Sequence, residues 1–141
     1  MRRYRLRGII AYGLIAALLL VVTCCTHSQP SELPLGYVDV KPGPNITGVV
    51  SVVGWAAAED GISKVCLYVD RQAASCTESI TGGRPDVAAV YPHIAGAGTS
   101  GWSIQFDSSG LSTGNHEFLI QATTKSGATR DLGSMNVAVT K

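Results

Sequence analysis

The chain has 141 residues, which is enough for one domain, and a formal net charge of +1. Four arginines lie in residues 1–7, so from residue 26 onward seven basic residues face ten acidic ones, a net charge of −3. Because nucleic-acid binding requires cationic side chains that neutralise phosphates, a nucleic-acid partner is not expected.

The first predicted element is an export signal. After the arginines of residues 1–7, residues 8–23 form an apolar run of sixteen residues without a charge. This is the pattern of a secretory signal peptide, and the run is shorter than the about 18 to 20 residues of a membrane-spanning helix. The sequence therefore predicts a signal helix over residues 1–25, with an uncleaved signal anchor as the alternative.

The apolar run ends in two adjacent cysteines, Cys24 and Cys25. The ending Val-Val-Thr-Cys-Cys resembles the lipobox of bacterial lipoproteins, in which one cysteine is lipidated. Either cysteine fits with a valine three positions earlier, although the preceding residue departs from the usual Gly, Ala or Ser. We expect a lipid-tethered protein of the cell envelope. An ordinary signal peptide that releases a secreted protein is the alternative.

The rest of the chain consists of strand and turn patterns. Residues 26–35 are polar and contain prolines, which is typical of a flexible linker, so residues 36–141 form the predicted domain. No segment of it shows sustained helical periodicity. Turn signals separate seven candidate strands, at residues 37–41, 48–57, 63–70, 73–78, 102–107, 116–124 and 134–140. Such a series predicts an all-β, antiparallel, immunoglobulin-like sandwich.

Two cysteines lie within the predicted domain, Cys66 and Cys76. Alternating apolar residues at positions 65–69 place Cys66 on the outward face of a half-buried strand. If the chain reverses at residues 70–72, Cys76 lies opposite Cys66 or nearly so. An oxidising compartment then favours a cross-strand disulfide; two free thiols are the alternative.

Five short motifs occur in order: GWA (54–56), VD (69–70), RPDVAAVYP (84–92), SGW (100–102) and GNH (114–116). Together they resemble a bacterial Ig-like module, over residues 36–141. The glycine usual after the VD pair is Arg71 here, so the turn must adopt a geometry that a non-glycine residue tolerates. The resemblance implies a β-sandwich that accompanies exported or membrane-bound enzymes and itself has no established catalytic role.

The RPDVAAVYP motif is predicted to be part of a long crossover, because its two prolines exclude an interior strand. Val87, Val90 and Tyr91 have the spacing of one helical turn. We expect their side chains to cover the open end or the edge of the sandwich.

The charged residues of this motif allow two interpretations. In the structural one, Arg84 pairs with a carboxylate such as Asp86 or one in the turn at 59–61. In the functional one, Arg84, Asp86 and Tyr91 face solvent and contact a partner protein or a glycan.

Two motifs typical of enzymes lack the required context. G-x-G-x-x-G at 96–101 precedes a predicted strand, whereas nucleotide binding requires a helix there. G-x-S-x-G at 110–114 belongs on a strand-to-helix turn of a larger parallel sheet, and His116 follows Ser112 by only four residues. Neither nucleotide binding nor hydrolysis is expected.

Metal and modification sites are equally weak. Glu59, Asp60 and Asp86 have no calcium-loop spacing, and the histidines are far apart in the sequence. No metal and no other cofactor is therefore expected. The acceptor pattern at 45–47 is interpreted as a chance match.

The aromatic residues give the remaining alternative. Trp55 and Trp102 are expected to anchor the core, with each indole N–H bonded to backbone. A glycan-binding surface would instead need Tyr68 exposed and coplanar with Trp102 or Tyr91.

The sequence therefore predicts a non-catalytic Ig-like interaction or spacer module of the cell envelope. A glycan-binding accessory module that recognises envelope or extracellular polysaccharide is the alternative. An enzyme is not expected, because no nucleophile has a base at a plausible spacing.

Overall fold

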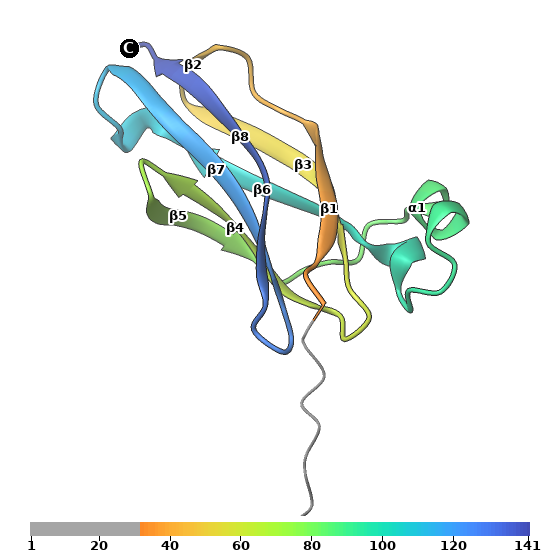
Figure 1. Ribbon diagram of the computed structural model, residues 1–141. Helices are drawn as coiled ribbons and strands as arrows, with labels where there is room; N and C mark the ends of the chain where they lie inside the picture. The colour runs from red at the N-terminus through yellow and green to blue at the C-terminus, as the bar shows by residue number, and fades with distance from the viewer. Residues whose placement is uncertain (1–31) are drawn as a thin grey trace, which may run out of the picture.

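The computed structural model describes residues 32–141, which form two stacked β-sheets (Figure 1). The first sheet contains, in spatial order, β1 (Leu35–Val40), β3 (Val49–Ala57) and β6 (Gly101–Asp107). The second contains β2 (Asn45–Ile46), β8 (Thr129–Val139), β7 (Gly114–Thr124), β4 (Ile62–Val69) and β5 (Gln72–Thr77). The described residues also form one α-helix, α1 (Pro85–Val90), and two short 3-10 helices, η1 (Ala97–Thr99) and η2 (Ser108–Gly110).

This arrangement confirms the predicted all-β, immunoglobulin-like sandwich. All seven predicted strands are present, but β2 was not predicted, and it pairs in parallel with β8. The sandwich is therefore not purely antiparallel. The prolines at 42 and 44 separate β1 from β2, so the chain pairs first with β3 and then crosses to the other sheet.

Several predictions concern residues outside the described range. The signal helix over residues 1–25, Cys24, Cys25 and most of the linker fall there. Within residues 32–141, no helix has the length and apolar character needed to cross a membrane.

The core lies between the sheets and follows from the alternation of the strands. Val65, Leu67 and Val69 of β4 are buried, as are Phe118 and Ile120 of β7. Each such side chain contributes about 1.5 to 3 kcal/mol when removed from water. The sandwich is thus held mainly by apolar burial.

The crossover between β5 and β6 packs on the outer face of the three-stranded sheet. Ala57, Val87, Ile94 and Ala97 form a second buried cluster there, against which Trp55 and other partly buried residues pack. Figure 1 shows α1 beside β1, away from the five-stranded sheet. The crossover covers a face, whereas we expected it to cover an open end or an edge.

Only part of the predicted apolar turn is buried. Val87 is 3% exposed, whereas Val90 is 67% exposed, so the prediction for Val90 was wrong. The helix ends at Val90, and the chain then turns so that Tyr91 packs on Trp55, with ring centroids 5.7 Å apart.

Candidate functional site

The predicted disulfide joins neighbouring strands. Cys66 of β4 and Cys76 of β5 are directly opposite each other and are bonded. Both lie on the outer face of the five-stranded sheet, because Val65 and Leu67 point into the core. Tyr68 is on the same outer face and is half-buried.

The turn after β4 has an unusual backbone. Asp70 and Arg71 both adopt positive φ, 50° and 69°. Arg71 therefore adopts the left-handed conformation that glycine adopts most easily. The turn keeps this geometry although the usual glycine is absent. Such a pair of left-handed residues matches the twist of a two-residue hairpin.

The side chain of Asp70 connects this hairpin to β7. Its Oδ1 accepts a hydrogen bond from the backbone N–H of Glu117 at 2.9 Å, and its Oδ2 lies 2.6 Å from Nδ1 of His116. The backbone N–H of Asp70 also donates to the carbonyl oxygen of Glu117 at 2.9 Å. The VD and GNH motifs therefore meet in space, although they are 46 positions apart.

His116 also contacts the loop that precedes β7. Its Nε2 lies 2.9 Å from the carbonyl oxygen of Ser112 and 3.4 Å from the Oγ of Ser112. His116 thus lies between Asp70 and Ser112, as the histidine of a hydrolase triad lies between its acid and its serine. The sequence did not lead us to expect this arrangement. We call these three residues the Asp70 clasp.

The hydrogen bonds of the clasp do not suit catalysis. A triad needs Nε2 of the histidine to accept the serine proton, but the carbonyl of Ser112 can only accept, so Nε2 must donate to it. Nδ1 faces a carboxylate, which favours a proton there as well. Asp70 lines a cavity between the β4–β5 turn and η2, whereas Ser112 and His116 do not line that cavity. The geometry supports an imidazolium with a structural role.

Both titrating groups of the clasp are shifted toward their charged forms. The pKa of His116 is raised, first by its hydrogen bond to Asp70 and then by the Ser112 carbonyl. The pKa of Asp70 is lowered, first by the backbone N–H of Glu117 and then by His116.

These shifts predict a pH dependence of stability. The raised pKa of His116 means that its contribution is complete below 6.5 and is lost as pH rises through the folded-state value. The lowered pKa of Asp70 means that its contribution is complete above 3.8 and is lost as pH falls through its folded-state value. The clasp is therefore most stabilising between pH 3.8 and 6.5.

Thermal unfolding from pH 4 to pH 9, about the range in which carboxylates and histidines titrate, measures this effect. The Tm difference between the native chain and Asp70→Asn should be largest near pH 5, about the middle of the window, and should shrink toward pH 9. His93→Gln, which changes an exposed histidine outside the clasp, should follow the native curve. A difference that does not vary with pH would contradict the assignment.

Arg84 is the centre of a second polar cluster. Its Nε and Nη2 donate to the two carboxylate oxygens of Asp86 at 2.9 and 2.7 Å, and its Nη1 donates to Asp39 of β1 at 2.5 Å. Arg84 lowers the pKa of Asp86 to about 2, and the hydrogen bonds that Arg84 donates to Asp86 and Asp39 raise its own pKa. The pairing with Asp86 confirms one expectation, whereas the turn at 59–61 takes no part in it. Asp39 was not foreseen.

Arg84 links the crossover to the outer face of the three-stranded sheet. Its backbone follows Gly82, which bridges to Gly101 of β6, whereas Asp39 belongs to β1. Because β3 lies between β1 and β6, residues 82–84 and the guanidinium together connect the β6 side of this face with β1. This face has two parts.

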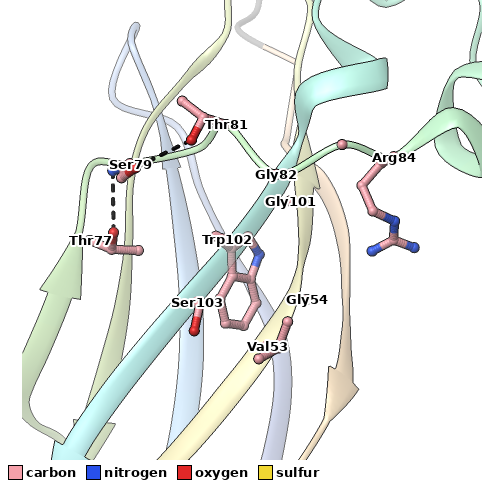
Figure 2. A pocket seen from close by; sticks show the side chains of 11 residues that line it. Val53, Gly54, Thr77, Ser79, Thr81, Gly82, Arg84, Gly101, Trp102 and Ser103 are labelled. Carbon is pink, nitrogen blue, oxygen red and sulfur yellow. Dashed lines mark hydrogen bonds between the residues drawn. The ribbon is translucent and has the colours of Figure 1, made fainter.

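One part is a cavity of about 410 Å³ beside β6 (Figure 2). A side chain at Gly82 or Gly101 would clash, because a Cβ on either would lie about 3 Å from the other's backbone. Hydroxyl groups line the cavity together with Arg84 and Trp102; they belong to Thr77, Ser79, Thr81 and Ser103.

The expectation that the indole N–H of Trp102 bonds to backbone was wrong. Trp102 is only 3% exposed, as expected for a core anchor, but its indole Nε1 has no hydrogen-bond partner among the described residues. The glycine at position 54 leaves room for the ring, which approaches within 2.6 Å of where a Cβ would be.

The other part of the face is aromatic. Tyr37 of β1 is directly opposite Trp55 of β3, and Tyr91 packs on Trp55 and approaches His93 with ring centroids 6.4 Å apart. Tyr37 is 57% exposed, while Trp55 and Tyr91 are half-buried.

The aromatic platform proposed from the sequence does not form. Tyr68 lies on the outer face of the five-stranded sheet, Tyr91 lies against the three-stranded sheet, and Trp102 faces the core. Tyr68 is therefore separated from Arg84 and Asp86 by the whole sandwich.

The acidic turn residues have a local structural role. Oδ2 of Asp60 accepts a hydrogen bond from the backbone N–H of Ser126 at 2.8 Å. Hydrogen bonding to Ser126 is the main cause that lowers the pKa of Asp60. Asp86 belongs to the separate Arg84 cluster. Within residues 32–141, no group of three or more His, Cys, Asp or Glu side chains could hold a metal ion.

Comparison with known proteins gives the fold alone. No known protein family and no curated protein sequence matches the chain. Fibronectin(III)-like modules of CbhA from Clostridium thermocellum are 16% identical, with 76% of this chain and 46% of that chain covered and a TM-score of 0.48. An endo-beta-1,4-mannanase from Thermotoga petrophila is 16% identical, with 82% of this chain and 21% of that chain covered and a TM-score of 0.50. This chain spans less than half the length of either protein.

Proposed function

We propose that the chain is a non-catalytic, Ig-like interaction or spacer module of the cell envelope, tethered by a lipid on Cys24 or Cys25. The observation that carries the proposal is how the motif side chains are used. Asp70, His116 and Arg84 all hold one part of the domain to another. The contact between His116 and Ser112 serves the same purpose, because Nε2 of His116 donates to the Ser112 carbonyl oxygen.

The disulfide supports an extracytoplasmic location. Bonds of this kind form and persist in oxidising compartments, and Cys66 and Cys76 are positioned opposite each other by strand pairing. The arginine-rich start and apolar run of the sequence agree with export.

The path of the chain suits a spacer. In Figure 1, β1 begins at the end of the sandwich that carries the β7–β8 hairpin, and the C-terminus lies at the opposite end. A tether before β1 would therefore hold the β4–β5 turn and η2 away from the membrane.

Membrane fractionation tests the tether. We expect the native chain in the membrane fraction, and one of the variants Cys24→Ala and Cys25→Ala in the soluble fraction. The variant that is released identifies the lipidated cysteine. The double variant Cys66→Ala, Cys76→Ala is the control, since it removes the two disulfide-bonded cysteines outside the leader and should stay with the membrane. If neither leader variant is released, the lipoprotein proposal is wrong.

A second function, glycan binding, is favoured by one observation. An exposed tyrosine, Tyr37, lies beside Trp55 on a sheet face that also carries a polar cavity. Flat aromatic groups beside convergent polar groups are typical of small-molecule sites.

A further inference from the structure

We propose that the outer face of the three-stranded sheet binds a neutral polysaccharide, with Tyr37 and Trp55 stacking on one sugar and the cavity beside β6 holding the next. The inference rests on glycan binding, the second function proposed above. The surface differs from the one expected from the sequence, because it uses Tyr37 and excludes Tyr68.

The stacking part of the site is formed by strand pairing. Tyr37 and Trp55 are directly opposite each other on β1 and β3, and the next position across the sheet is Gly101 of β6. Gly101 has no side chain, and the backbone of Gly82 occupies the place of one. Both glycines line the cavity, so no bulky side chain separates it from the aromatic pair. The apolar C–H faces of a pyranose ring can pack on Tyr37, which keeps 57% of its surface exposed.

Arg84 and Asp39 supply directional hydrogen bonds between the two parts. A guanidinium has five N–H donors, and three are used in the bonds to Asp86 and Asp39. The other two remain for sugar oxygens. Asp39 uses Oδ2 for Arg84, and its Oδ1 has no partner among the described residues, so it can accept from a sugar hydroxyl.

The cavity matches the chemistry of sugar hydroxyls. Its volume of about 410 Å³ is within the usual range of about 300 to 1,000 Å³ for ligand pockets. A hydroxyl both donates and accepts hydrogen bonds. The hydroxyl oxygens of Ser79 and Thr81 are 3.4 Å apart, which is long for a hydrogen bond, so both can bond to a sugar instead. Ser103 is exposed and has no hydrogen-bond partner among the described residues.

Charge and backbone pairing argue against two other occupants, an anionic polymer and a peptide strand added at Gly101. One cation faces two carboxylates in the Arg84 cluster, and seven basic residues face ten acidic ones from residue 26 onward. An anionic polymer would therefore be repelled. A peptide cannot add as a strand at Gly101, because the N–H and C=O of Gly101 are already bonded to Gly82.

Affinity electrophoresis of the full chain in non-ionic detergent tests the inference. The probes are hydroxyethyl cellulose and the polysaccharide of the producing cell's own envelope, separated by anion exchange into neutral and anionic fractions. We expect the neutral envelope fraction to retard the chain and the anionic fraction to leave it unchanged. Tyr37→Ala should weaken binding at least about tenfold, in line with the loss of one aromatic anchor. Ser103→Ala should weaken it less.

Tyr68→Ala is the matched control, since it removes a tyrosine from the opposite face, and it should bind like the native chain. If Tyr37→Ala is unstable, Ser103→Ala decides the test, provided that its thermal unfolding matches that of the native chain. Absence of retardation by the neutral envelope fraction and hydroxyethyl cellulose would overturn the inference. So would equal losses in the Tyr37 and Tyr68 variants.

A protein partner gives a different result. Periodate cleaves vicinal diols, so it should abolish retardation by the neutral fraction, whereas protease should not. The opposite outcome would assign this face to a protein and overturn the inference. The fractionation experiment measures membrane association and this one measures sugar binding, so either proposal can fail alone.

Discussion

Replacing Gly54 with alanine should lower the free energy of unfolding by about 3 kcal/mol, at the upper end of the usual cost of overpacking a core. A Cβ at this position would lie 2.6 Å from Cζ2 of Trp102 and would overlap the backbone carbonyl oxygen of Tyr37. Trp102 is buried, and Tyr37 belongs to a paired strand, so neither can move aside cheaply. The loss is a large part of the about 5 to 15 kcal/mol that stabilises a typical domain.

Urea denaturation measures this change, and Gly110→Ala is its control. A Cβ on Gly110 would meet no atom within 4 Å, so that variant should stay within about 0.5 kcal/mol of the native chain. If Gly54→Ala is as stable as Gly110→Ala, the close packing of Trp102 over β3 is wrong.

Removing the disulfide is the second large effect. The double variant Cys66→Ala, Cys76→Ala should lose about 3 kcal/mol, because the unfolded chain regains the freedom of a short closed loop. The two cysteines are 10 positions apart and link β4 to the edge strand β5.

The same denaturation measurement with and without reductant provides the control. Reductant should destabilise the native chain by about as much as the double substitution does, and it should leave the double variant unchanged. A native chain that reductant does not destabilise would show that the bond contributes nothing to stability.

Local patterns were sufficient to predict the strands. The alternation of Val65, Leu67 and Val69 indicated both the buried face of β4 and the outward position of Cys66. The two residues of β2 are too few for any periodicity. The parallel pairing of β2 with β8 depends on the path of the whole chain, so it could not be predicted.

The contacts between motifs required the sheet order. Asp70 reaches His116 because β4 and β7 are antiparallel neighbours, with Val69 paired to Phe118. Asp39 of β1 meets Arg84 because the crossover between β5 and β6 carries Arg84 to the outer face of the three-stranded sheet. Neither arrangement is encoded in local spacing, and Tyr37 was missed for the same reason.

Trp102 shows a limit of general rules about side chains. A buried indole N–H usually finds a partner, and here the ring instead fills space over Gly54 with Nε1 unpaired. In this part of the core, packing against the glycine outweighs one hydrogen bond, whose net contribution is about 0.5 to 1.5 kcal/mol.

Labelling of Ser112 with a fluorophosphonate, which reacts with activated serines, tests most directly whether Asp70, His116 and Ser112 form a structural clasp or a catalytic triad. Because Nε2 of His116 donates to the Ser112 carbonyl, the hydroxyl has no base. Mass spectrometry of the treated full chain should therefore find no adduct on Ser112. A stoichiometric adduct on Ser112 that disappears in His116→Gln would contradict the structural role and the non-catalytic function proposed with it.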